Sequence, residues 1–353
     1  IVATLFGDGP DICWLAQNGP LNDTTQLSQA SKGNTSNVYK VEADELDDSQ
    51  RKAIELGLNK RRPLVLIQGP PGTGKSTVVC KLIMEAVSRG ERVLATAPTN
   101  AAVDNLVERL VEQNMHNDNH INVVRIGNPF RVAPAVSSRS LSAIVESKMA
   151  GFQKEFARRR ADLRSDLRQC LGDDSLATGI RQLLKQLSKS LKQKEKEVIE
   201  ETLRNAHVIL STNTGSGETL VQNLPAFDLV LIDEAAQAVE PACWIPLLKG
   251  RRAVLAGDPC QLAPIILSRD ALDGGLGVSL LERACGLHGG ALRTLLKVQY
   301  RMNDAIASWS SKEMYQGELQ SSPNVASHLL ADVSGVKVCM YVCMYVCMYV
   351  CIF

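Results

Sequence analysis

The stretch GPPGTGKST at residues 69–77 has the residue types and the spacing that hold phosphate groups. It follows the apolar run LVLI and precedes a helical pattern, which is the context this motif requires. Gly72 and Gly74 let the backbone N–H groups turn inward around a phosphate at the start of the helix. Lys75 would reach the β- and γ-phosphates, and Ser76 would offer its hydroxyl to Mg²⁺. We therefore expect a nucleotide phosphate site at Gly69, Pro70, Pro71, Gly72, Thr73, Gly74, Lys75, Ser76 and Thr77.

Two adjacent carboxylates stand at the end of another apolar run, in FDLVLIDEAAQ at residues 227–237. Asp233 suits the water shell of a Mg²⁺ ion that Ser76 also contacts. Glu234 suits a general base that takes a proton from an attacking water molecule. Kinases have no use for this second carboxylate, whereas ATP hydrolases need it. The pair therefore favours hydrolysis of a nucleoside triphosphate.

Three further stretches carry polar side chains suited to the same chemistry: APTNAAVDN (97–105), LAGDPCQLAP (255–264) and VQYRMNDAI (298–306). Gln261 could sense the γ-phosphate. Tyr300 could stack on a base, and its neighbour Arg301 could point a cation at a phosphate. Each signal is weak alone, because an arginine is more often a surface residue and a tyrosine is more often part of the core.

The elements that would position these residues are short apolar runs, each followed by turn residues: LVLIQG (64–69), RVLATAP (92–98), HVILSTN (207–213), FDLVLID (227–233) and AVLAGD (253–258). Runs of this kind are typical of parallel strands that are buried on both faces. Helical stretches alternate with them, so we expect a doubly wound α/β domain with a parallel sheet.

Residues 139–205 interrupt this alternation, because they are rich in charge and contain no strand pattern. We expect an inserted helical hairpin, since an unstructured loop of this length is uncommon in a domain. Four leucines at helical spacing could join its two arms: Leu183, Leu184, Leu187 and Leu191. The excess of Lys and Arg in the hairpin fits a solvated face or a nucleic-acid contact equally well.

Taken together and in order, the motifs resemble those of the superfamily 1B helicases over about residues 46–336: LDDSQRKA, GPPGTGKST, APTNAAVDN, TNTG, DEAAQ, GDPCQL and QYRM. The resemblance implies a RecA-like P-loop domain that uses ATP and Mg²⁺. It implies that Gln50 recognises the adenine edge, that Tyr300 stacks on the adenine, and that Gln261 couples the γ-phosphate to the nucleic-acid site. It also implies that Arg301 is an arginine finger.

The same resemblance implies a partner, single-stranded DNA or RNA. Its backbone would contact Pro98, Thr99 and Asn100, the hairpin would overhang it, and movement would run 5′ to 3′. Two positions depart from the family pattern, because Ala263 stands where proline is usual and Asn303 where histidine is usual. Neither departure removes a phosphate or metal ligand.

The resemblance also divides the chain into four parts. Residues 1–45 would be a linker and the end of an upstream domain, and residues 46–297 the first RecA-like domain. Residues 298–337 would be a truncated second RecA-like domain. Residues 338–353 would be a low-complexity segment in which the unit V-C-M-Y repeats before Ile352 and Phe353, as expected for a translated four-base microsatellite. For an incomplete chain, the alternative is a nucleotide- and nucleic-acid-binding module without motor activity. A weaker alternative is a different P-loop ATPase such as an AAA+ machine, which does not combine the Gln50 motif with GDPCQL and QYRM.

Composition adds few constraints. The net charge is +1, so any nucleic-acid site must be a local patch. Six cysteines outside the repeat are scattered and are expected to be reduced and buried: Cys13, Cys80, Cys170, Cys243, Cys260 and Cys285. No window is apolar enough for a membrane span. We expect a monomer in the cytoplasm, the nucleus or both.

Overall fold

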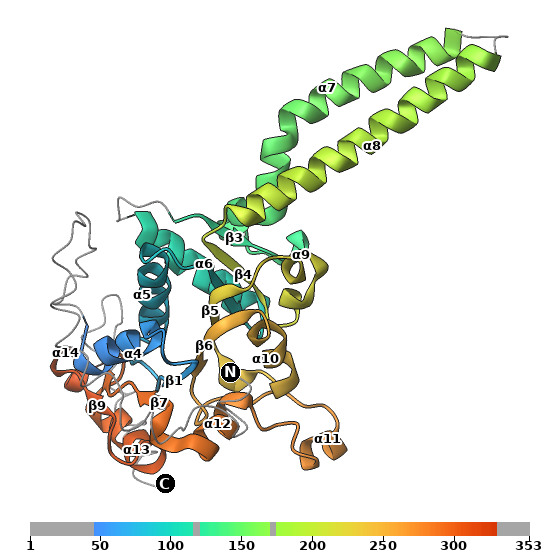
Figure 1. Cartoon of the computed structure of the whole chain (residues 1–353). Helices are drawn as coiled ribbons and strands as arrows, with labels where there is room; N and C mark the ends of the chain where they lie inside the picture. The colour runs from blue at the N-terminus through green and yellow to red at the C-terminus, as the bar shows by residue number, and fades with distance from the viewer. Residues whose placement is uncertain (1–45, 116–120, 170–173, 330–353) are drawn as a thin grey trace, which may run out of the picture.

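The computed structural model describes residues 46–115, 121–169 and 174–329. Helix and strand labels follow Figure 1. The expectations for residues 1–45 and for the repeat at residues 338–353 lie outside the described residues.

Within the described residues, seven strands form one fully parallel sheet in the order β3-β4-β2-β5-β6-β1-β7. Their bounds are β1 (Leu64–Gln68), β2 (Val93–Ala97), β3 (Val123–Arg125), β4 (Val208–Thr212), β5 (Phe227–Ile232), β6 (Gly250–Gly257) and β7 (Arg293–Leu295). The strand that leads into the phosphate loop, β1, therefore lies between β6 and β7 and next but one to β5. The α/β fold and all five expected strands are confirmed.

The sheet is buried on both faces. Strand β1 contributes Leu64 and Leu66 to one apolar cluster, and Val65 and Ile67 to another. Since successive side chains of a strand point to opposite faces, the two clusters lie on opposite sides of the sheet. Burial on both faces explains why these strands are visible in the sequence as continuous apolar runs.

Helices cover the two faces (Figure 1). One cluster includes residues of α4 (Asp48–Leu58), α5 (Lys75–Ser88) and α6 (Asn100–Met115). The other includes residues of α10 (Glu240–Leu247) and α12 (Leu280–His288), together with the base of the hairpin. Two shorter helices, α9 (Thr219–Gln222) and α11 (Arg269–Asp273), complete this part of the chain.

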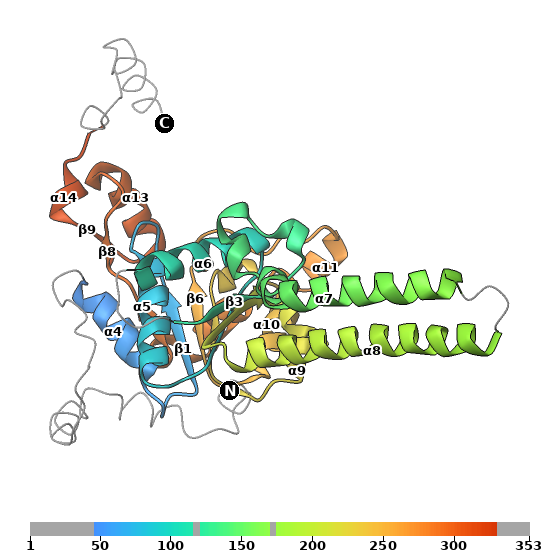
Figure 2. The same ribbon diagram turned by 90° about the horizontal axis from the view of Figure 1, so that it is seen from above.

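The expected hairpin is present as α7 (Leu141–Gln169) and α8 (Asp174–Arg204), which project away from the sheet (Figures 1 and 2). Leu141, Val145 and Met149 of α7 anchor its base in the core. The expected role of Leu183 is wrong, because its side chain is 49% exposed, whereas Leu191 packs on the core.

The last described segment lies on the opposite side of the sheet from the hairpin (Figure 2). It contains β8 (Val298–Gln299), α13 (Asp304–Met314), β9 (Gln320–Ser321) and α14 (Pro323–Ala326). Strands β8 and β9 form a separate parallel pair.

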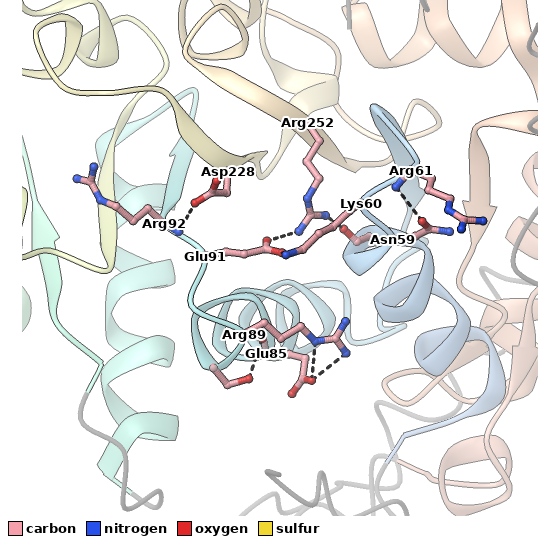
Figure 3. Close-up of polar contacts among 11 residues, drawn as sticks. Asn59, Lys60, Arg61, Glu85, Arg89, Glu91, Arg92, Asp228 and Arg252 are labelled. Atoms are coloured by element: carbon pink, nitrogen blue, oxygen red, sulfur yellow. Dashed lines mark hydrogen bonds and ion pairs between the residues drawn. The ribbon is translucent and has the colours of Figure 1, made fainter. Parts of the chain in front are cut away.

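A group of charged residues lies at the end of the sheet where strands β2 and β6 begin (Figure 3). The Glu91 carboxylate pairs with Arg252, and its Oε1 lies 3.3 Å from Lys60 Nζ. Arg252 also donates to the carbonyl oxygen of Gly57, in the last turn of α4. The group therefore fixes α4 to the sheet.

Four described cysteines are free thiols. Cys80 and Cys243 are buried, as expected, and burial raises the pKa of each thiol to about 12. The expectation of burial is wrong for Cys260, which is exposed. None of the described helices is both long and apolar enough to cross a membrane.

Candidate nucleotide-binding site

The phosphate loop connects β1 to α5, which begins at Lys75. Gly72 and Gly74 have φ angles of 77° and 72°, in the left-handed region that favours glycine. A Cβ on Gly72 would lie 2.7 Å from the Cβ of Arg301, so glycine is also required by the close approach of that segment. The Thr73 hydroxyl donates to the Pro70 carbonyl oxygen at 2.7 Å and closes the turn. The loop therefore has the conformation expected for phosphate binding.

Both predicted carboxylates face the loop lysine. Lys75 Nζ lies 2.6 Å from Glu234 Oε1 and 3.4 Å from Asp233 Oδ1. Burial opposes the charged form of Lys75, but the two carboxylates outweigh it and raise the pKa of its ammonium group. Strand β5 ends at Ile232, so both acids stand at the carboxyl edge of the sheet. Parallel strands commonly place ligand sites at this edge.

Glu234 itself has an unusual backbone, with a φ of 52°. This left-handed conformation is rare for a residue other than glycine and is often found at functional sites. Its Oε2 accepts a hydrogen bond from Gln237 Nε2 at 3.1 Å. The side chain that we predicted as the base is thus oriented by two partners, Lys75 and Gln237.

The remaining polar residues of the first helical turn, Ser76 and Thr77, are half-buried beside the loop. The described residues contain no group of three or more His, Cys, Asp or Glu side chains that could hold a metal ion. The ligands predicted for a metal ion are the hydroxyl of Ser76, in the first turn of α5, and the carboxylate of Asp233, which lies 3.4 Å from Lys75 Nζ. This set fits Mg²⁺, which is usually held by one or two protein oxygens together with water and substrate phosphates.

Gln261 belongs to a network centred on Asp258, which is 2% exposed. Gln261 Nε2 donates to Asp258 Oδ2 at 2.7 Å and to the Gly69 carbonyl oxygen at 3.3 Å. The Tyr315 hydroxyl donates to the same Oδ2 at 2.6 Å, across 57 positions of sequence. Asp258 and Tyr315 were missed by the sequence analysis, although Asp258 lies inside the GDPCQL stretch.

The QYRM segment brings Tyr300 and Arg301 to the phosphate loop. The Tyr300 backbone N–H donates to the Gly72 carbonyl oxygen at 2.9 Å. The Tyr300 ring is 43% exposed, and its hydroxyl donates to Asp47 Oδ2 at 3.1 Å. Burial and the negative charge of Asp47 raise the pKa of the Tyr300 phenol to about 12.

Gln299, which the sequence analysis missed, sets the shape of this segment and is fully buried. Its Oε1 accepts from the backbone N–H groups of Arg301 and Met302 at 2.8 and 2.7 Å. Its Nε2 donates to the Met302 carbonyl oxygen at 2.7 Å and to Ser321 Oγ at 2.9 Å. The turn is therefore tied to β9.

Gln50 lies against the loop and is 4% exposed. Its Nε2 donates to the Thr73 carbonyl oxygen at 2.9 Å, and its Oε1 accepts from the Asp47 backbone N–H at 3.2 Å. Asp47 caps α4 in return, by accepting from the backbone of Gln50. Recognition of adenine by Gln50 stays a prediction.

The stretch of Pro98, Thr99 and Asn100 follows β2 and starts α6. It stands at the same edge of the sheet as Asp233, because β2 and β5 are parallel neighbours. Thr99 Oγ1 accepts a 3.2 Å hydrogen bond from the Ala102 backbone N–H. These three residues are therefore separate from the phosphate loop but on its side of the sheet.

Comparison with known proteins gives the family. Two family models, each described as an AAA domain, match residues 45–269 and 276–348. DNA-binding protein SMUBP-2 of Rattus norvegicus is 42% identical over 300 residues, which is 82% of this chain and 29% of that protein. ATP-dependent helicase NAM7 of Saccharomyces cerevisiae is 36% identical over 286 residues, which is 80% of this chain and 26% of that protein.

The chain thus spans less than a third of the length of these relatives. Among solved structures, an arterivirus helicase in complex with DNA matches 82% of this chain and 48% of its own, at 11% identity and a TM-score of 0.40. The first AAA-domain match covers well over half of the sequence and contains the phosphate loop, the two carboxylates and Gln261. The chain therefore belongs to the AAA-domain family of the superfamily 1 helicases.

Proposed function

We propose that this chain forms the ATP-binding part of a helicase or translocase, which hydrolyses ATP to move 5′ to 3′ along single-stranded DNA or RNA. The observation that carries the proposal is the contact of Lys75 Nζ with the carboxylates of Glu234 and Asp233, beside a loop of left-handed glycines. A phosphate-binding cation, a candidate base and a candidate metal ligand meet there at one edge of the sheet.

Each residue has a role that follows from its chemistry. The loop N–H groups and Lys75 would hold the β- and γ-phosphates. Glu234 would accept a proton from the attacking water. Arg301, held at the loop by the contact between Tyr300 and Gly72, would stabilise the charge on the transferring phosphate. Tyr300 would stack on the adenine and Gln50 would recognise its edge.

Gln261 has a more restricted role than a general γ-phosphate sensor. Both of the acceptors beside its Nε2, Asp258 Oδ2 and the Gly69 carbonyl oxygen, require the amide nitrogen to face them. Any further hydrogen bond from this side chain must therefore use its oxygen, which only accepts. An acceptor suits the attacking water better than it suits a phosphate oxygen.

Mg²⁺, when bound, would neutralise charge on the phosphate oxygens, and Ser76 and Asp233 would hold it. Pro98, Thr99 and Asn100 would contact the backbone of the single strand. A translocating protein must hold phosphates and sugars rather than base edges, so its affinity should fall with salt.

The test compares Lys75→Ala and Glu234→Gln in this chain, with Lys312→Ala on the exposed surface of α13 as the control. Binding of a fluorescent ATP analogue is measured by titration, and release of phosphate is measured with and without a single-stranded oligonucleotide. Lys75→Ala should weaken nucleotide binding by roughly tenfold or more, as expected for loss of a charged hydrogen-bond donor. Glu234→Gln should keep binding and abolish turnover, and Lys312→Ala should change neither.

Two outcomes would contradict the proposal. Normal turnover by Glu234→Gln would show that Glu234 is not the base. Nucleotide binding without any stimulation by single strands would favour a binding module without motor activity.

A further inference from the structure

Asn100, one of the residues expected to contact a single strand, is held by a buried arginine. Arg125 Nη2 donates to Asn100 Oδ1 at 2.7 Å, and the Arg125 side chain is 1% exposed. Arg125 ends β3, a three-residue strand at the edge of the sheet, whereas Asn100 begins α6. The contact thus joins β3 to α6, and no sequence pattern predicts that these two elements meet.

A carboxylate also fixes the arginine. Arg125 Nε donates to Asp104 Oδ1 at 3.0 Å, and Asp104 Oδ2 accepts from the Ala133 backbone N–H at 2.8 Å. Arg125 Nη1 donates to the carbonyl oxygen of Ile126 at 2.6 Å. A Cβ on Gly127 would overlap this guanidinium, so the glycine makes room for it. Each of the three nitrogens of the guanidinium therefore has a partner in the protein.

The chemistry of these partners sets the orientation of the Asn100 amide. A guanidinium has donors and no acceptor, so only the amide oxygen of Asn100 can face Arg125. The amide nitrogen, with two donor hydrogens, must then lie on the other side of the Asn100 carboxamide. Asn100 is only half-buried, so this donor end can reach a ligand. Phosphate oxygens accept hydrogen bonds, and nucleic-acid backbones are commonly held by such side-chain donors.

Stability alone is a weak reason for this buried pair, because apolar side chains of similar volume often stabilise a fold as well or better. We propose that Arg125 and Asp104 are positioning residues, which fix the Asn100 amide with its nitrogen toward a phosphate of the bound single strand. This inference rests on the proposed function, because it takes single-strand binding at Asn100 as given. Arg125 acts only through Asn100 and does not touch the nucleic acid.

The decisive variant is Asn100→Asp, measured by fluorescence anisotropy with labelled oligothymidylate and oligouridylate at low salt. Its Oδ1 still accepts from Arg125, but the outward donor becomes a charged acceptor that repels phosphate. Binding should weaken by roughly tenfold or more. Asn100→Ala should give a smaller loss of affinity. The control is Asn205→Asp, which makes the same charge change at the exposed residue that follows α8 and should change the affinity little.

The positioning role is tested by the double variant Arg125→Met/Asp104→Asn, which removes both buried charges and keeps an acceptor for Ala133. Because Asn100 is retained but no longer oriented, single-strand affinity should fall several-fold. The slope of log affinity against log salt should not change, since no phosphate-contacting cation is lost. The affinity for the ATP analogue and the melting temperature show whether the fold is intact.

The outcomes separate the two levels of the argument. If the wild-type chain binds neither oligonucleotide, the proposed function fails at this surface and the inference fails with it. If the wild-type chain binds but Asn100→Asp binds equally well, or the double variant matches the wild type, only the positioning role is refuted. A changed salt slope in the double variant would mean that Arg125 itself interacts with phosphate, which would also refute it.

Discussion

Glu91→Ala should be among the most destabilising single substitutions in this chain. Glu91 is 5% exposed and lies in the loop before β2, where its carboxylate pairs with Arg252 (Figure 3). Arg252 is 6% exposed, and its other contact is the Gly57 carbonyl oxygen. Removal of Glu91 would leave a buried guanidinium with a carbonyl as partner and no countercharge.

The expected magnitude follows from burial. Breaking a buried ion pair by removing one partner costs about 3–5 kcal/mol, because the remaining charge stays desolvated. The Glu85–Arg89 pair at the end of α5 is the matched control, since it also joins a glutamate to an arginine but Arg89 is 47% exposed. Exposed pairs of this kind contribute about 0.3–0.5 kcal/mol, so Glu85→Ala should have little effect.

Thermal and urea unfolding measure the difference. A domain of this size loses about 2–4 °C in melting temperature per kcal/mol, so Glu91→Ala should melt roughly 6–20 °C lower. The double variant Glu91→Leu/Arg252→Leu should recover much of that loss, because it removes the unpaired charge. Equal effects of Glu91→Ala and Glu85→Ala would refute the reasoning, as would a double variant that is less stable than the single one.

Two further predictions concern the nucleotide site. Gly72→Ala should abolish tight binding of a fluorescent ATP analogue, because the φ of Gly72 is 77° and a Cβ there would meet Arg301. The control is Gly90→Ala, at a φ of 78° with open space around it, which should lower only the melting temperature. Equal nucleotide affinities of the two variants would contradict the prediction. Tyr300 should titrate near pH 12 rather than 10 in absorbance at 295 nm, and Asp47→Ala should lower this pKa. Because the raised pKa favours the neutral phenol, the contribution of the Tyr300 phenol to stability is present below pH 10 and is lost as the pH rises through about 12. If the difference between the titrations of the wild type and Tyr300→Phe is centred near pH 10, the contact with Asp47 is not made.

Much of the fold could be predicted because its strands are buried on both faces. Residues 64–67 are apolar at every position, and β1 is found at Leu64–Gln68. Strands β3 and β7 were missed, since three residues are too few to form a recognisable run. The hairpin was predicted from its length and charge, but Leu183 shows that helical spacing alone does not determine which leucine faces the other arm.

The site was predicted in residue type more than in geometry. Local motifs were sufficient to select Lys75 and Glu234 as candidates for one site, but nothing in the sequence gives the 2.6 Å contact between them. Asp258, Tyr315 and Gln299 were missed because their importance lies in contacts made after folding. A buried carboxylate that joins the ends of β6 and α13 has no local pattern to reveal it.

The length of the hairpin has a mechanical consequence. Helix α7 has 29 residues, which at 1.5 Å per residue corresponds to a length of about 44 Å from its base in the core to its tip. Each degree of rotation at its base would displace the tip by roughly 0.8 Å, by simple leverage over that length. The base lies next to Ser140, which bridges to the backbone of Arg125. A force applied at the tip would therefore act as a torque on the segment that holds Asn100.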